Sequence, residues 1–305
     1  MSIFAIAYDK KIGGKNKEKK RDMAHFSVME LRRQMVGTLR TTLGDDAEAA
    51  ARALICDTWR WSLTDLALRQ QESVEEAEAE RLLAMAERMA RHEPLQYVTG
   101  HCDFCGIEIA TARGALIPRP ETEQLVDAVC EWARGRKGLK VLDIGTGSGC
   151  IAVAISEKLD GAEVVGIDVS DEALAVARHN VEGRSIELRK VDVLSAEAGN
   201  IGTFDIVVSN PPYVMESERA SMERNVLDYE PERALFVPDD DPLVFYRRIT
   251  ELCRNGLLGC GGGLFFEINE ALGGEMKRMM ESAGFRDVVI KKDYLGKDRI
   301  AVGTL

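Results

Sequence analysis

Apolar residues recur at helical spacing over the first third of the chain. Between residues 26 and 92 the spacing is clearest in ELRRQMVGTLRTTL and in AEAERLLAMAERMA, and strand-like alternation is absent. Apolar residues three and four positions apart form one face of a helix. The pattern therefore predicts a small domain of about four helices, with Leu82, Met85 and Met89 in its core.

Polar residues and proline predict where these helices begin and end. Ser73, with Glu76 three positions later, predicts a capping box at the start of the last long helix. Asp65 is a candidate cap for the short helix before it. Pro94 is expected to end the helical part, because the residue before a proline disfavours helical backbone.

The pattern changes after the helices. Residues 97–117 predict a short β-hairpin, with Gly106 at its turn and Gly114 near its end. The segment PRPETEQLVDAVCEWA then predicts a helix that a proline opens.

From Lys140 onward, buried strands alternate with helices. The predicted strands are KVLDIG, EVVGID, SIELRKVD, FDIVVSN and GGGLFFEI, and FRDVVIKKD with RIAVGTL predicts a closing hairpin. Alternating strands and helices form parallel sheets covered on both faces. The sequence therefore predicts an α/β fold with a doubly wound, mostly parallel, Rossmann-like sheet of seven strands.

These patterns divide the chain into four parts, and 305 residues are enough for two cores. We expect a basic, flexible tail at 1–25, a helical domain at 26–95, a hairpin linker at 96–117 and the α/β domain at 118–305.

Charge is distributed unevenly. The formal net charge is -11, yet residues 1–40 hold ten Lys and Arg against four Asp and Glu, so the remainder is strongly acidic. An acidic body does not favour binding of duplex nucleic acid. We interpret the basic tail as a solvated segment, and binding of RNA or an acidic partner is the less favoured alternative.

Cysteine usage and hydropathy indicate the compartment. The chain has seven Cys, an odd number without a disulfide framework, and no apolar run or secretory signal that would direct it to a membrane or out of the cell. Cys102 and Cys105 lack a second pair at zinc-site spacing, so we expect no metal. The protein is expected to be cytoplasmic.

A glycine-rich turn directly follows the first predicted strand of the α/β domain. Gly145, Gly147 and Gly149 alternate with Thr146 and Ser148, before a helix. Glycines there let the backbone approach a ligand closely. Asp168 ends the next strand, where a carboxylate can bind ribose hydroxyls. The competing interpretation is a nicotinamide dinucleotide site. Such a site has the spacing G-x-G-x-x-G, whereas this sequence has G-x-G-x-G after Asp143.

The segment SNPPY follows the hydrophobic strand FDIVV. Pro211 and Pro212 donate no backbone N–H, so their carbonyl oxygens remain free to accept. With the Asn210 side-chain oxygen, they can hold the two N–H groups of a planar NH2, and Tyr213 offers an aromatic face. The structural alternative is a turn at the end of a strand, for which Asn-Pro is a common signal.

Several motifs together resemble one enzyme family. G-x-G-x-G after an aspartate is similar to the first motif of class I S-adenosylmethionine methyltransferases, and NPPY occurs in those that modify adenine or cytosine amines or protein glutamine. PRPETE at 118–123, YEPERAL at 229–235 and the order of the domains resemble the peptide chain release factor glutamine methyltransferase family, over about residues 27–305.

The resemblance implies a reaction and its cofactor. The family methylates the glutamine of the Gly-Gly-Gln motif in class I release factors, with S-adenosyl-L-methionine as donor and S-adenosyl-L-homocysteine as product. The implied partner is therefore a class I release factor bound by a monomer, with no stable nucleic acid and no membrane.

The resemblance also implies roles for individual residues. Those expected at the cofactor are Gly145, Thr146, Gly147, Ser148, Gly149, Asp168, Asp192, Val193 and Asn210. Those expected at the substrate glutamine are Asn210, Pro211, Pro212 and Tyr213, with Arg119, Glu121 and Thr122 over the mouth of the site. Asn210, Pro211 and Tyr213 are the expected catalytic residues.

Three positions depart from the family pattern. Val193 stands where the family often has an aromatic residue beside the adenine, so an aromatic stack is expected to be absent. Asn269 and Leu272 stand where the family often has Gly and Gln, and neither receives a function.

Three alternatives stay open. A sister enzyme that methylates a ribosomal-protein glutamine would share these motifs. An adenine-amine DNA methyltransferase would need base flipping and a basic recognition domain, which the acidic body does not favour. A non-catalytic cofactor-binding adaptor would not need an intact NPPY.

Overall fold

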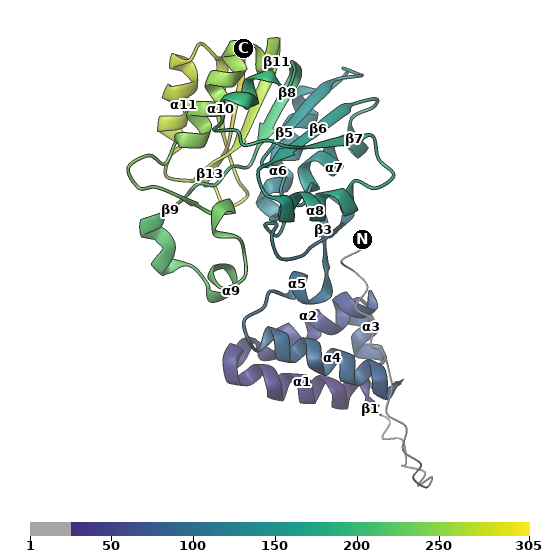
Figure 1. Ribbon diagram of the computed structural model, residues 1–305. Coiled ribbons are helices and arrows are strands. Elements are labelled where there is room, and N and C mark those ends of the chain that lie inside the picture. The colour runs from purple at the N-terminus through teal and green to yellow at the C-terminus, as the bar shows by residue number, and fades with distance from the viewer. Residues whose placement is uncertain (1–25) are drawn as a thin grey trace, which may run out of the picture.

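The computed structural model describes residues 26–305, and the basic tail predicted at 1–25 lies outside the described residues. Four helices form the N-terminal domain: α1 (Val28–Leu43), α2 (Ala47–Trp59), α3 (Leu63–Leu68) and α4 (Glu76–Met89). Leu82, Met85 and Met89 lie in its core, as predicted. Figure 1 shows this domain below the α/β domain.

Two features of the helical domain differ from the prediction. The two-residue strands β1 (Phe26–Ser27) and β2 (Ser73–Val74) pair antiparallel, so strand structure is present where none was expected. The capping box predicted at Ser73 is wrong, because Ser73 lies in β2 and Glu75, the residue before α4, makes no side-chain cap. The backbone of Ser73 pairs with β1, so Ser73 is not available as the cap of α4.

The predictions for Asp65 and Pro94 are also corrected. Ser62 caps α3, and Asp65 is the third helical residue of that capping box, accepting from the Ser62 backbone N–H at 3.0 Å. Pro94 precedes a further short helix, α5 (Leu95–Thr99), instead of ending the helical part. Its extended backbone suits the position before a helix.

A hairpin and a helix lead into the α/β domain. β3 (His101–Phe104) and β4 (Ile107–Ala110) pair antiparallel around Cys105 and Gly106, which both have positive φ. The hairpin is confirmed, but it is shorter than the predicted 97–117, because 97–99 belong to α5 and residues 111–117 form no strand. α6 (Pro120–Trp132) begins with its proline, as predicted. All seven cysteines are free.

The sheet of the α/β domain has seven strands in the order β12-β13-β11-β8-β5-β6-β7, with β13 antiparallel to its neighbours. This confirms the predicted mostly parallel sheet. The strands are β5 (Lys140–Ile144), β6 (Glu163–Asp168), β7 (Ile186–Lys190), β8 (Phe204–Ser209), β11 (Leu258–Glu267), β12 (Arg286–Lys292) and β13 (Asp298–Thr304).

Helices cover both faces of the sheet (Figure 1). They are α6, α7 (Cys150–Lys158), α8 (Asp171–Asn180), α10 (Val244–Leu252) and α11 (Gly273–Ser282). Val141 and Phe265 pack with α6 and α7, whereas Leu142 and Phe266 pack in the core that contains α10 and α11. Neighbouring strand residues point to opposite faces, so nearly continuous apolar strands fill two cores.

A lobe of short elements follows β8. It contains β9 (Val214–Met215), α9 (Arg224–Leu227), β10 (Phe236–Val237) and 3-10 turns at Glu216–Ser221 and Glu232–Ala234. Figure 1 shows α9 below the sheet, beside the N-terminal domain. The Tyr229 hydroxyl donates to the Arg91 carbonyl at 2.6 Å, and the Arg113 guanidinium lies 4.5 Å from the Tyr229 ring centre. The lobe therefore connects the end of β8 with the helical domain.

Three further turns complete the described elements. They are 3-10 turns at Gly44–Asp46 and Ala196–Asn200 and a π-helical turn at Cys253–Leu257. None of the helices within residues 26–305 is long and apolar enough to cross a membrane.

Candidate functional site

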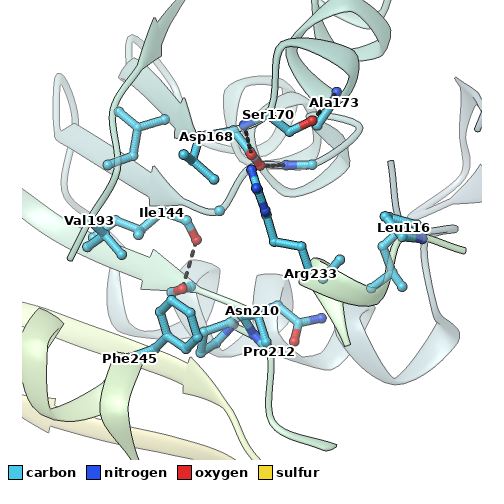
Figure 2. Close-up of a pocket in the computed structure, with 18 of the residues that line it drawn as sticks. Leu116, Ile144, Asp168, Ser170, Ala173, Val193, Asn210, Pro212, Arg233 and Phe245 are labelled. Carbon is cyan, nitrogen blue, oxygen red and sulfur yellow. Dashed lines mark hydrogen bonds between the residues drawn. The ribbon is translucent and has the colours of Figure 1, made fainter. Parts of the chain in front are cut away.

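The order of the strands places a crevice at one edge of the sheet. β5 comes first in the chain, with β6 and β7 on one side of it and β8 and β11 on the other. The loops after β5 and β8 therefore lead away from each other, and ligands of open α/β sheets bind at such a point. A cavity of about 630 Å³ lies there, a volume typical of cofactor sites. Figure 2 shows its lining.

The glycine-rich loop forms the floor of this cavity. Gly145 and Gly147 line it, and both have positive φ (71° and 56°), a conformation that glycine adopts at little cost. Thr146 and Ser148 are buried and do not line it. Gly149 lies against Ala177 of α8, where an added Cβ would come within 3.4 Å of the alanine methyl.

A buried aspartate holds the loop from below. Asp143 is fully buried at the end of β5, and the Thr146 hydroxyl donates to its Oδ2 at 2.6 Å. Burial raises the pKa of Asp143 to about 7. The backbone N–H groups of Gly145 and Thr146 both donate to the Ile167 carbonyl at 2.9 Å, which ties the loop to the neighbouring strand.

Asp168 joins the loop to the next strand. Its Oδ2 accepts from the Gly147 N–H and its Oδ1 from the Ser170 N–H, both at 2.9 Å (Figure 2). A carboxylate has about four acceptor sites, so about two remain for hydroxyl groups of a ligand. Asp192 also lines the cavity, with its Oδ1 accepting from the Leu194 N–H at 2.9 Å.

Apolar side chains form part of the remaining wall, and the charged Glu172, Glu232 and Arg233 also line the cavity. The apolar ones include Ala173, Val191, Val193, Leu194 and Ile249. Phe245 of α10 lies on the same side as Val193 and is the one aromatic side chain among the described residues lining the cavity (Figure 2).

Sequence reasoning missed Phe245. Phe245 is far from Val193 in the sequence, and it stands next to the fully buried Tyr246 in an amphipathic helix. An aromatic residue in that pattern normally indicates core packing.

The opposite side of the cavity is the NPP segment. Asn210, Pro211 and Pro212 line the cavity, directly after β8. The Ser209 hydroxyl donates to the Ile144 carbonyl at 2.7 Å, which fixes the end of β8 against the end of β5. The Asn210 Nδ2 donates to the Thr122 Oγ1 at 3.2 Å.

Tyr213 does not line the cavity. Its hydroxyl donates to the Glu267 Oε1 at 3.0 Å, and its ring packs against the core around α10 and α11. Burial, followed by the nearby Glu267 charge, raises the pKa of the Tyr213 hydroxyl. The structure therefore places Tyr213 behind the NPP segment, as part of its support.

Arg119, Glu121 and Thr122 also lie outside the cavity lining. Arg119 pairs with Glu230 at 2.5 Å, and the same carboxylate accepts from the Ile117 N–H at 3.1 Å. Glu121 is half-buried in the first turn of α6, and Thr122 is fully buried there. The YEPERAL segment thus supplies a buried carboxylate that holds the linker, which the sequence motif alone did not show.

The groups around the cavity fit a nucleoside cofactor. Asp168 offers a carboxylate with free acceptor sites, which suits a diol, and Val193 with Phe245 offers an apolar wall with one aromatic ring, which suits a flat base. Gly145 and Gly147, without Cβ atoms, leave open space between this wall and the NPP segment. Among residues 26–305, no group of three or more His, Cys, Asp or Glu side chains is arranged to hold a metal ion.

Two family models match the chain. The model described as the methyltransferase small domain covers residues 122–228, and the model described as the PrmC N-terminal domain covers residues 30–100. The two together cover most of the helical domain and the strand-end loops after β5, β6, β7 and β8.

Named relatives match over most of their length. A release factor glutamine methyltransferase from Bacteroides thetaiotaomicron is 45% identical over 84% of this chain and 92% of its own. The one from Chlorobaculum tepidum is 33% identical over 90% and 96%. Among solved structures, a release factor-specific protein-(glutamine-N5) methyltransferase from Alicyclobacillus acidocaldarius is 27% identical, with a TM-score of 0.40 over 64% of this chain and 98% of that one.

Proposed function

This chain belongs to the release factor glutamine methyltransferase family, and from this premise we propose that it methylates the side-chain nitrogen of a glutamine in class I release factors. The target is the glutamine of the Gly-Gly-Gln motif, and the methyl donor is S-adenosyl-L-methionine. The observation that carries the proposal is the NPP segment, which offers acceptor oxygens on one side of a cavity whose other side fits a nucleoside.

We assign the cofactor to the four strand ends that line the cavity. Gly145 and Gly147 would lie along its chain, Asp168 would accept from the ribose hydroxyls, and Val193 with Phe245 would hold the base beside Asp192. When bound there, the cofactor supplies an electrophilic methyl group on a positively charged sulfur.

The residues of the NPP segment would prepare the substrate nitrogen. An amide nitrogen is a poor nucleophile, because its lone pair is delocalised into the carbonyl. The Asn210 Oδ1 and the Pro211 carbonyl would accept from its two N–H groups and hold it in line with the methyl group, which is a proximity effect. The same oxygens would stabilise the positive charge that grows on the nitrogen, and its extra proton would leave to solvent.

We assign recognition of the protein substrate to the helical domain at 26–95. Every residue that lines the cavity lies beyond residue 113, so the helical domain takes no direct part in the cofactor site. A glutamine loop alone offers little surface, whereas protein recognition usually needs about 800 Å² per partner. The Tyr229–Arg91 contact connects the domain to the lobe that follows the NPP segment. Since release factors act in translation, the proposed compartment is the cytoplasm.

The test is Asn210→Ala. Losing one preorganised polar contact to the reacting group typically costs ~100-fold in rate, so we expect the single-turnover rate on release factor to fall at least that far. The affinity for S-adenosylhomocysteine and the melting temperature should change little, because the cofactor side of the cavity keeps its contacts.

A purely structural turn predicts a different result. In that case Asn210→Ala would lower the melting temperature and reduce cofactor binding and catalysis in parallel. A near-normal single-turnover rate in the folded variant would refute the proposed chemistry.

A further inference from the structure

A buried carboxylate supports the NPP segment from outside the cavity. Glu267 ends β11 and is 1% exposed. The Thr122 hydroxyl donates to its Oε2 at 2.6 Å, and the Tyr213 hydroxyl donates to its Oε1 at 3.0 Å. Both oxygens therefore act as acceptors, which is the arrangement of an ionised carboxylate.

The Thr122 hydroxyl links this carboxylate to Asn210. A hydroxyl has a single proton, and Thr122 uses it toward Glu267. Its oxygen can therefore only accept from Asn210, and it does so from the Nδ2 at 3.2 Å. A hydroxyl that did not donate to Glu267 could donate to the Asn210 oxygen just as well.

The direction of these hydrogen bonds decides which end of the Asn210 amide faces the cavity. The Oδ1 and Nδ2 atoms lie on opposite sides of the amide carbon. Because Nδ2 is held toward Thr122, Oδ1 is directed away from it, and Asn210 lines the cavity beside Pro211. A negative charge at the far end of a hydrogen-bonded chain also polarises the amide and makes its oxygen a better acceptor.

Opposing influences act on the pKa of Glu267, and the net direction is upward because burial is the largest of them. Burial raises the pKa of Glu267 and Glu121 adds to the rise, whereas the hydrogen bonds from Thr122 and Tyr213 and the charge of Arg299 lower it. Arg299 is itself held by Asp293 at 3.2 Å.

We propose that Glu267 and Thr122 are positioning residues that fix the Asn210 amide with its oxygen toward the substrate, and that this orientation makes the site select glutamine over glutamate. The inference rests on the proposed function. A glutamine NH2 donates to the Asn210 oxygen, whereas a glutamate carboxylate has no proton to donate and would place its charge against that oxygen. A site built around one hydrogen-bonding pattern rejects an analogue that leaves its buried polar groups unpaired.

The experiment uses the full chain, the class I release factor of the same genome, and that factor with its target glutamine changed to glutamate. Binding of the two factors is measured at pH 8 with S-adenosylhomocysteine present. We expect the wild type to bind the glutamine form at least ~10-fold more tightly, since a mismatch of polar groups costs at least this much.

The matched variants are Thr122→Val and Thr122→Ser. Valine keeps the shape and removes the hydroxyl, so the Asn210 amide is free to turn its NH2 toward a carboxylate. We expect the preference for glutamine to shrink at least ~10-fold and the single-turnover rate to fall toward ~100-fold below wild type. Serine keeps the hydroxyl and should restore both. If Thr122→Val does not fold, Thr122→Ala removes the same hydroxyl in a smaller side chain.

Thr250→Val is the control. Thr250 is 1% exposed in α10, and its hydroxyl lacks a hydrogen-bond partner among the described residues, so this change should leave the preference and the rate as they are. A Thr122→Val enzyme that is slower but keeps the wild-type preference would overturn the inference, and so would a wild type without any preference.

The two proposals fail separately. If the wild type methylates no release factor but Thr122→Val still removes the binding preference, the orientation of Asn210 stands and the proposed reaction is wrong. If the wild type methylates release factor and the preference is unaffected in Thr122→Val, the reaction stands and the orientation role is wrong.

Discussion

The side chains around the cavity come from two kinds of position in the sequence. Gly145, Asp168 and Asn210 each stand at or directly after the end of a parallel strand, where the fold gathers loops at one edge. Phe245 instead reaches the cavity from a helix that packs on one face of the sheet. It lies on the same side of the cavity as Val193, the position at which the family often has an aromatic residue.

Phe245→Ala should weaken cofactor binding. Stacking of a base on an aromatic side chain is worth about 1–3 kcal/mol, which corresponds to roughly a 5- to 150-fold rise in the dissociation constant of S-adenosylhomocysteine. Phe245→Leu keeps apolar volume without a ring and should lie between alanine and wild type. Calorimetric titration of the three proteins gives the comparison.

Phe236→Ala serves as the control for Phe245. Phe236 is also half-buried, but it lies in β10 under the Arg219 guanidinium, 4.0 Å from its ring centre, and does not line the cavity. Its replacement should leave cofactor affinity unchanged. Equal affinities for wild type and Phe245→Ala would show that the ring is part of the core alone.

At the scale of elements, one side chain joins three parts of the fold. Asn180 is buried at the end of α8. Its Oδ1 accepts from the Ala110 N–H at 2.8 Å, and its Nδ2 donates to the Ala110 carbonyl at 3.0 Å and to the Ser148 carbonyl at 2.9 Å. The hairpin linker and the glycine-rich loop are therefore held by the same amide.

Asn180→Ala should destabilise the α/β domain and loosen the loop. It removes the partners of one backbone N–H and two carbonyl groups, and a buried polar group left unpaired costs about 1–3 kcal/mol. We expect a lower free energy of unfolding in urea together with weaker binding of S-adenosylhomocysteine. Asn200→Ala, at an exposed position, provides the comparison. Unchanged stability in Asn180→Ala would mean that water replaces the amide without loss.

At the scale of the whole molecule, the two domains have separate cores. The apolar residues of α1, α2 and α4 form one cluster, and the two faces of the sheet form two others. Polar contacts connect the helical domain to the rest of the chain, among them Arg91 with Tyr229 of the lobe and Asp57 with His101 of the hairpin linker at 3.1 Å. Such an arrangement allows one domain to bind a protein while the other holds the cofactor.

Removing residues 1–95 should separate these tasks. We expect the remaining chain to bind S-adenosylhomocysteine, and its kcat/KM on folded release factor to fall by at least ~100-fold, since most of the surface for protein recognition would be gone. Circular dichroism would confirm that the α/β domain is folded. Equal methylation by the shortened and complete chains would refute the role assigned to the helical domain.

By itself, the sequence determined the elements and the chemical character of the site. Hydrophobic periodicity predicted the helical domain, the hairpin and the seven-stranded sheet, because a period of 3.6 or 2 reports directly which face of an element is buried. The glycine-rich turn and the NPP segment stood out because glycine and proline alter the backbone where they occur. These signals are local, and the structure confirms the elements they predicted.

Only the tertiary structure decided which side chains meet. Glu267 reaches Thr122, Glu230 holds Arg119, and Phe245 lines the cavity beside Val193, although each pair is far apart in the chain. The cap predicted at Ser73 was wrong for a related reason, because pairing with β1 replaced the local interaction. A periodic pattern shows that a residue is buried, but its hydrogen-bond partner depends on how distant elements pack, and that packing is set by the whole chain.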